Sequence, residues 1–168
     1  MPQPPAITFP FLPKCEYAEP KESPLSIPEL ISAKKIQARV IEMGKELTEI
    51  YGDETITCIG VLKGSALFLA DLIREIESPL EIDFLGVSSY QGTTSSGVVR
   101  ITHDLRSNVE GRNVLIVEDI VDTGLTLSYL LRNLQSRNPK SLRVATLLDK
   151  PSRRKVSVPI DFIGFQIP

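Results

Sequence analysis

Short runs of mostly apolar residues alternate along this chain with longer stretches in which apolar positions recur at helical spacing. The short runs predict strands at residues 56–62, 81–88, 97–102, 113–117, 142–148 and 161–165. The longer stretches predict helices at residues 32–51, 66–76 and 125–134. Strands that alternate with helices indicate an α/β fold, with a mostly parallel central sheet flanked by helices.

The first 28 residues break this pattern. They contain eight of the 13 prolines, which remove backbone N–H donors and fix φ. Helix and central strand are therefore excluded, and we expect an extended or disordered arm over residues 1–28. The remaining residues, 29–168, are enough for one domain with its own core.

Composition narrows the class of protein. A net charge of −2 argues against nucleic acid bound over the whole surface, and we expect the basic cluster at residues 153–155 to be a solvated turn. Two cysteines, Cys15 and Cys58, are too few for a disulfide scaffold and favour a reducing compartment, so we expect a cytoplasmic protein. No apolar run reaches the roughly 18 residues of a membrane span, and we expect no membrane partner.

The densest group of reactive side chains lies between the predicted strand at 113–117 and the helix that follows. Its members are two adjacent acids and then an aspartate, a threonine and a glycine: Glu118, Asp119, Asp122, Thr123 and Gly124. A strand end that meets a helix start offers backbone N–H groups to phosphate. Carboxylates repel phosphate, but they suit the hydroxyls and bridging Mg²⁺ of a phosphorylated ribose. We therefore predict a ribose-phosphate site rather than an ordinary acidic turn.

Two further loops follow predicted strands, at the end of the sheet where open α/β folds bind ligands. Lys63, Gly64 and Ser65 offer an ammonium, an amide and a hydroxyl to a dianion. Lys150 stands just after a strand and before a stiffening proline. Taken alone, the first loop is also typical of a simple turn and the second of a surface lysine. Residues 89–97 are polar with two glycines, which predicts a mobile loop.

Taken together, these loops resemble the type I phosphoribosyltransferases. The stretch from Glu118 to Gly124, EDIVDTG, matches that family's phosphoribosyl pyrophosphate motif residue by residue. The resemblance is closest to the 6-oxopurine branch, the hypoxanthine (guanine) phosphoribosyltransferases. Four other segments support this branch: residues 62–65, 89–90, 148–151 and 161–168. The resemblance covers residues 31–168 and implies the type I phosphoribosyltransferase fold.

The resemblance implies roles for the acidic motif. Glu118 and Asp119 would hold the ribose hydroxyls, directly or through Mg²⁺. Asp122 would be the general base on N7 of the purine. The 5′-phosphate would lie at the helix start, bound by Thr123, Gly124, Leu125 and Thr126.

The resemblance also implies roles outside that motif. Lys63 and Gly64 would meet the pyrophosphate, in a loop that often holds a non-proline cis peptide bond in this branch. Lys150 would donate to O6 of the base and so reject the amino group of adenine. Ser89 and Tyr90 would begin a loop that closes over the site and keeps out water.

The implied activity is pentosyl transfer in purine salvage. The chain would form IMP, or IMP and GMP, together with pyrophosphate from 5-phosphoribosyl 1-pyrophosphate and a 6-oxopurine base, with Mg²⁺ as cofactor. The choice among hypoxanthine, guanine and xanthine stays open. The family is usually dimeric or tetrameric, so we expect a homodimer or homotetramer.

The resemblance is incomplete after Pro168. Family members continue there with an aromatic that stacks on the purine, contacts to its 2-position, a second metal ligand and an arginine near pyrophosphate. We therefore expect a domain truncated at its C-terminus, with an incomplete hood, which leaves an active enzyme and an inactive relative both open.

The alternative from another class is a non-catalytic or regulatory protein on this fold, such as an RNA-binding operon regulator. The lack of an extended basic face argues against it. Adenine and orotate transferases are the nearest enzymatic alternatives, and their acidic motifs differ from the EDIVDTG of this chain.

Overall fold

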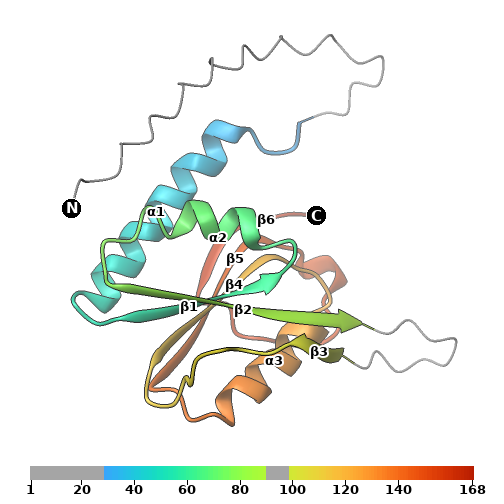
Figure 1. Ribbon diagram of the computed structural model, residues 1–168. Coiled ribbons are helices and arrows are strands. Elements are labelled where there is room, and N and C mark those ends of the chain that lie inside the picture. Colours follow the sequence, from blue (N-terminus) through green and yellow to red (C-terminus); the bar gives the residue numbers. More distant parts are fainter. Residues whose placement is uncertain (1–28, 90–98) are drawn as a thin grey trace, which may run out of the picture. The chain divides into compact units, whose positions relative to one another are not determined.

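The computed structural model describes residues 29–89 and 99–168 (Figure 1). The chain divides into two units, residues 1–30 and 31–168, and only the second is described below. The arm expected over residues 1–28 lies outside the described residues. In chain order, the elements are α1 (Ala33–Tyr51), β1 (Ile56–Leu62), α2 (Ala66–Leu72), β2 (Leu80–Ser89), β3 (Val99–His103), β4 (Asn113–Val121), α3 (Leu125–Gln135), β5 (Ser141–Asp149), the 3₁₀ turn η1 (Pro151–Arg153) and β6 (Phe162–Gln166).

The strands form one sheet in the order β3-β2-β1-β4-β5-β6. All neighbours are parallel except β2 and β3, which are antiparallel. The sheet is therefore mostly parallel, as the alternation of elements predicts. The carboxyl ends of β1, β4 and β5 reach the same edge, where open α/β sheets bind ligands.

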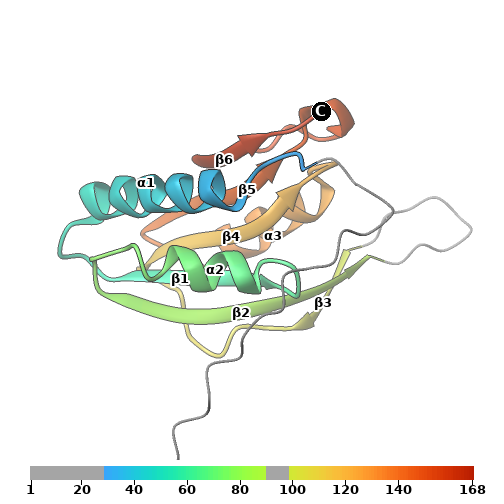
Figure 2. The same cartoon turned by 90° about the horizontal axis from the view of Figure 1, so that it is seen from above.

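Helices cover both faces of this sheet. Figures 1 and 2 show α1 and α2 together on one face and α3 on the other. Successive residues of β4 point to opposite faces, so that Leu115 and Val117 join the α1–α2 core while Val114 and Ile116 join the α3 core. A strand buried on both faces needs the continuous apolar run seen in the sequence.

Single residues explain where α1 begins and how it is attached to the sheet. Ser32 precedes the helix, and its hydroxyl accepts a hydrogen bond from the Lys35 N–H at 3.4 Å. Arg39 ties the helix to the far edge strand, because its guanidinium donates twice to the Ile163 carbonyl, at 3.2 and 3.0 Å. This contact holds α1 against β6, the edge strand of the sheet.

Two elements differ from their predicted lengths by four residues each, more than any other element. The fourth strand is predicted to end at residue 117, but β4 continues to Val121, with Val121 paired to Asp149 of β5. A buried neighbour strand extends the ladder past the first polar residue, which the apolar run alone does not indicate. The helix predicted over residues 66–76 ends at Leu72, and tighter three-residue turns continue the chain, with Glu75 N–H donating to Leu72.

Among the described residues, no helix combines the length and the apolar character needed to cross a membrane. Cys58 is a free thiol buried in the α1–α2 core, where it packs as a small apolar residue.

Candidate active site

The predicted site residues gather at the carboxyl ends of three neighbouring strands. Lys63 and Gly64 follow β1, and Lys150 follows β5. Glu118 and Asp119 lie within the last part of β4, and the remaining motif residues form the turn into α3 and its first turn: Asp122, Thr123, Gly124, Leu125 and Thr126. Ser89 ends β2, whereas Tyr90 and the rest of the expected closing loop to residue 97 lie outside the described residues.

The loop after β1 lies directly against the acidic motif. The peptide between Leu62 and Lys63 is cis, as the resemblance implies. A Cβ at position 64 would fall 2.6 Å from Cγ of Asp119, so only glycine permits this approach. The Ser65 hydroxyl, which we expected to face a dianion, is instead buried and donates to the Val61 carbonyl at 2.7 Å, so it holds the loop in place. The two loops therefore form one continuous surface.

Glu118 and Asp119 differ in environment although they are adjacent. Glu118 is buried within β4, and Asp119 is half-buried at the surface of the site. Burial, and then the negative charge of Asp119, raise the pKa of Glu118 to about 8. The uncharged form of Glu118 is thus favoured until a positive group arrives.

This pair of acids fits a metal ion that is bound mostly by a substrate. Within residues 29–89 and 99–168, no three His, Cys, Asp or Glu side chains converge to hold a metal ion by themselves. Mg²⁺ is commonly bound through one or two carboxylates and the phosphates of a substrate. Glu118 and Asp119 satisfy that description, and a cation beside them would favour the charged form of Glu118.

The turn from β4 into α3 forms a small pocket. Its volume is about 100 Å³, roughly three water molecules. The first helical hydrogen bond of α3 runs from the Ser128 N–H to the Gly124 carbonyl, so the preceding N–H groups have no partner within the helix. Glu118, Asp122, Thr123, Gly124 and Thr126 are among the lining residues. The pocket therefore offers hydroxyls and a helix N-terminus to a phosphate-sized group.

Backbone hydrogen bonds hold the segment after β5 over this turn. The Lys150 N–H donates to the Val121 carbonyl at 3.0 Å. The Lys155 and Val156 N–H groups both donate to the Thr123 carbonyl, at 2.9 and 3.2 Å. The segment that contains Lys150 is thereby fixed beside the acidic motif, as a shared site requires.

Two arginines of this segment contact the site, and sequence reasoning missed the contact that Arg153 makes. Arg153 forms an ion pair with Asp122 at 3.2 Å. Arg154 pairs with the buried Asp149 and is itself only 18% exposed. The prediction of a solvated turn at residues 153–155 is therefore wrong for Arg154. The only signal in the sequence was the proximity of both residues to Lys150.

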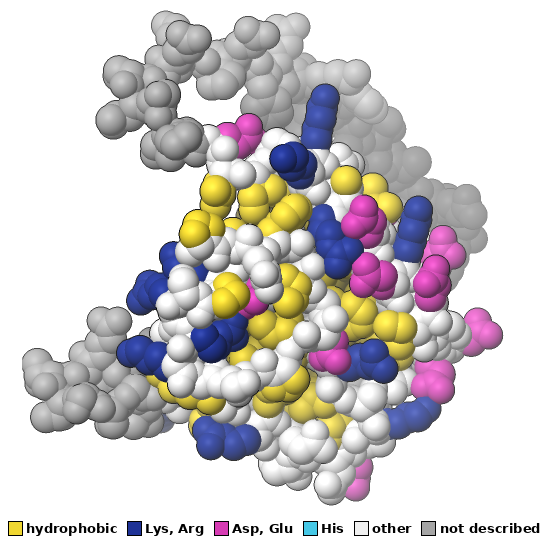
Figure 3. All heavy atoms as spheres, turned by 180° about the vertical axis from the view of Figure 1, so that it is seen from behind, with side chains coloured by type: hydrophobic (Ala, Val, Ile, Leu, Met, Phe, Trp, Pro, Cys, Tyr) yellow, Lys and Arg dark blue, Asp and Glu magenta, His cyan; other side chains and the backbone are white. Residues whose placement is uncertain are grey.

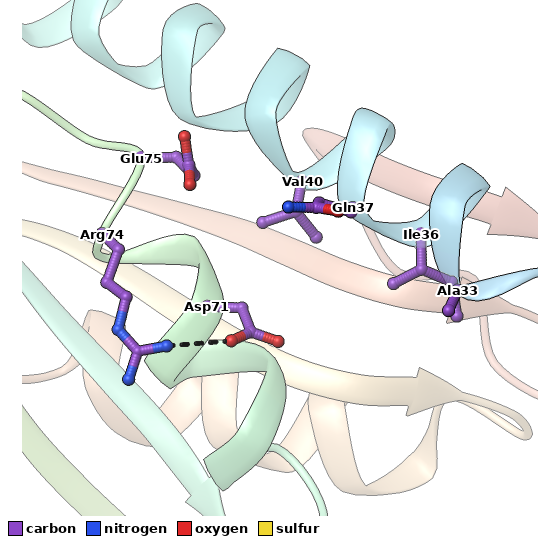
Figure 4. Close-up of a pocket in the computed structure, with 7 residues that line it drawn as sticks. All are labelled: Ala33, Ile36, Gln37, Val40, Asp71, Arg74 and Glu75. Atoms are coloured by element: carbon purple, nitrogen blue, oxygen red, sulfur yellow. Dashed lines mark hydrogen bonds and ion pairs between the residues drawn. The ribbon is translucent and has the colours of Figure 1, made fainter. Parts of the chain in front are cut away.

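A larger pocket lies away from these residues. It occupies about 490 Å³, and Figure 4 shows that α1 lines it mostly with apolar side chains and that α2 and the residues after it line it with charged ones. Asp71 and Arg74, both on the α2 side, pair at 3.3 Å. None of the predicted site residues lines this pocket, and its size alone does not make it the active site.

Charged side chains are unevenly distributed on the face that Figure 3 shows. Apolar side chains gather in the middle of this face, acidic and basic side chains are mixed on the right, and mostly basic side chains lie on the left.

Comparison with known proteins extends these observations. The model of the phosphoribosyl transferase domain matches residues 28–168. The chain is 54% identical over 140 residues to the hypoxanthine-guanine phosphoribosyltransferase of Bacillus subtilis, covering 83% of this chain and 78% of that protein.

Solved structures of hypoxanthine phosphoribosyltransferases are similar to this chain in fold. A hypoxanthine-guanine phosphoribosyltransferase of Bacillus anthracis superposes with a TM-score of 0.77 at 45% identity, covering 83% of this chain and 81% of that one. The hypoxanthine phosphoribosyltransferase of Trypanosoma cruzi, solved with its product IMP, gives a TM-score of 0.81 at 41% identity, covering 89% and 84%.

Proposed function

The chain belongs to the phosphoribosyltransferase family, and from this premise we propose that it is a purine-salvage enzyme. It transfers the phosphoribosyl group of 5-phosphoribosyl 1-pyrophosphate to a 6-oxopurine, forming IMP, or IMP and GMP, and pyrophosphate. The observation that carries the proposal is the meeting of three loops at one edge of the sheet, with Gly64 against Asp119. The relatives described above are named as transferases, so nothing favours the regulatory alternative.

The donor would be held by the β4–α3 turn. Thr123, Gly124, Leu125 and Thr126 bind the 5′-phosphate through hydroxyls and backbone N–H groups. Glu118 and Asp119 hold the ribose hydroxyls, and Lys63 and Gly64 meet the pyrophosphate. Glu118 and Asp119 would hold Mg²⁺, which would supply positive charge to the leaving pyrophosphate.

The acceptor would be oriented by the segment after β5. The Lys150 ammonium donates to O6 of the base. As N9 bonds to C1 of the ribose, the C1–O bond to pyrophosphate breaks and its electron pair leaves with the pyrophosphate. Asp122 takes the N7 proton, which prevents positive charge from remaining on the purine.

The proposal is tested by an assay of the purified chain with Mg²⁺, 5-phosphoribosyl 1-pyrophosphate and one base at a time. We expect nucleotide and pyrophosphate from hypoxanthine or guanine, and none from adenine, because its amino group faces another donor. Lys150→Met should raise KM for the base far more than KM for the donor. A chain that binds the donor but forms no nucleotide with any base is not this enzyme.

We also propose an assembly of two or four chains in the cytoplasm. Leu67 supports the assembly, because this large apolar residue follows the pyrophosphate loop and is 81% exposed. The buried free thiol of Cys58 supports a reducing compartment. Light scattering during size-exclusion chromatography measures the mass, and a monomer at micromolar concentration contradicts the assembly.

A further inference from the structure

The two carboxylate oxygens of Asp122 have different surroundings. Oδ2 lies 3.2 Å from a guanidinium nitrogen of Arg153. Oδ1 is shielded from solvent and has no hydrogen-bond partner among the described residues. A buried carboxylate oxygen without a donor is unfavourable and requires an explanation. Asp122 is also one of the residues that line the pocket at the start of α3.

The position of Arg153 follows from anchors on either side. The Lys150 N–H donates to the Val121 carbonyl at 3.0 Å, which fixes the start of η1 to the end of β4. Arg154 fixes the other side, because its guanidinium pairs with Asp149 and also donates to the Val121 carbonyl at 3.4 Å. Arg153 is held between these anchors and reaches Asp122, although its own side chain is 62% exposed.

We propose that Arg153 is a positioning residue for Asp122. By holding Oδ2, it fixes the carboxylate for the transfer of the proton from N7 of the purine. The N9–C1 bond forms, the C1–O bond to pyrophosphate breaks, and the N7 proton moves to the Asp122 carboxylate. This inference rests on the proposed function. It adds a residue that orients the general base without touching the purine.

The exposure of Arg153 separates this role from a structural one. An ion pair between side chains that are 62% and 32% exposed contributes little to stability, because solvent screens the attraction. Its loss should therefore leave the folded chain nearly as stable as before. An error in the orientation of a general base acts on the chemical step instead, because the proton must be transferred within hydrogen-bond reach.

The test uses steady-state kinetics of Arg153→Met and Arg153→Lys in the full chain. Arg153→Met should lower kcat roughly tenfold, less than the 10²–10⁴-fold that a general base supplies, and change KM for the donor less than about twofold. Arg153→Lys keeps a cation near Oδ2 and should recover part of kcat. Lys155→Met is the matched control, because it removes an exposed cation from the same segment and should leave kcat unchanged.

A double-mutant cycle makes the test specific. In an Asp122→Asn background, Arg153→Met should cause no further loss of kcat, because no carboxylate remains to be held. Equal losses in both backgrounds, or wild-type kcat in Arg153→Met, overturn the inference and leave the proposed function intact. A wild-type chain that forms no nucleotide with any base overturns the proposed function, and the inference with it. Thermal unfolding of each variant identifies any that fail to fold.

Discussion

Gly124 is constrained twice, by its own backbone and by a neighbouring loop. Its φ is +81°, and a Cβ would fall 2.5 Å from the Val156 carbonyl oxygen. Gly111 also has a positive φ, +70°, but a Cβ there would meet nothing within 4 Å. The two glycines therefore separate the cost of a left-handed backbone from the cost of a close contact between loops.

We expect Gly124→Ala to lower the free energy of unfolding by clearly more than Gly111→Ala. Gly111→Ala should cost about 1–2 kcal/mol, the usual penalty for a left-handed backbone with a Cβ. Gly124→Ala adds displacement of the segment after β5 and should exceed that by at least about 1 kcal/mol. Urea unfolding of both variants measures the difference. Equal losses of unfolding free energy in the two variants would show that the close approach to Val156 does not add to the cost of a Cβ at position 124.

Glu118 is a residue whose charge is unfavourable in the ligand-free chain. Its pKa rises from 4.5 to about 8 on folding, so the folded chain binds a proton more tightly than the unfolded chain. Stability is therefore lost as the pH increases between these two values, by up to about 1.4 kcal/mol per pH unit. Glu118→Gln does not titrate. Its stability relative to wild type should increase from pH 5 to pH 8 in urea unfolding without divalent ions, and a constant difference contradicts this.

Among the elements, β2 is linked to the segment after β3 by one carboxylate. Asp83 accepts hydrogen bonds from the backbone N–H groups of Arg106 and Ser107, at 2.8 and 3.0 Å, and from that of Phe84 at 2.8 Å. Burial by itself raises the pKa of Asp83, but these donors outweigh it and the pKa is lowered.

We expect Asp83→Asn to cost about 1–3 kcal/mol near pH 7, because hydrogen bonds to a charged acceptor are lost. A lowered pKa stabilises the fold above the ordinary pKa of aspartate, and this stabilisation is lost as the pH falls through the folded value. The difference between wild type and variant should therefore shrink toward pH 3. Asp104→Asn removes an exposed carboxylate nearby and is the control, with a cost of about 1 kcal/mol or less.

The local sequence pattern is sufficient to predict the bounds of some strands but not of others. The span of β1 is the one predicted, residues 56–62, because a strand buried along nearly its whole length requires a mostly apolar run. The end of β4 is not predictable in this way. Glu118 lies in the strand because Thr146 of β5 pairs with it, and a partner strand is not visible in local sequence.

For the molecule as a whole, we expect the donor and Mg²⁺ to stabilise the chain together. Two carboxylates without a third protein ligand among the described residues hold Mg²⁺ weakly, so Mg²⁺ alone should barely change Tm. Mg²⁺ with 5-phosphoribosyl 1-pyrophosphate at 100 times its Kd should add about 2.7 kcal/mol, or roughly 5–10 °C in Tm. Removal of Mg²⁺ by EDTA should reverse most of this. An equal shift with Mg²⁺ alone would indicate a complete protein metal site.

The sequence by itself determined the α/β class, the order of the elements and the acidic motif with its two lysine loops. These features depend on period, burial and short spacing, which neighbouring residues in the chain express. Only the tertiary structure decided that Gly64 touches Asp119 and that Arg153 reaches Asp122. Such contacts join residues about 30 to 55 positions apart. They depend on the order and register of parallel strands, which are set by packing in three dimensions. Neither segment's own sequence shows that order or register.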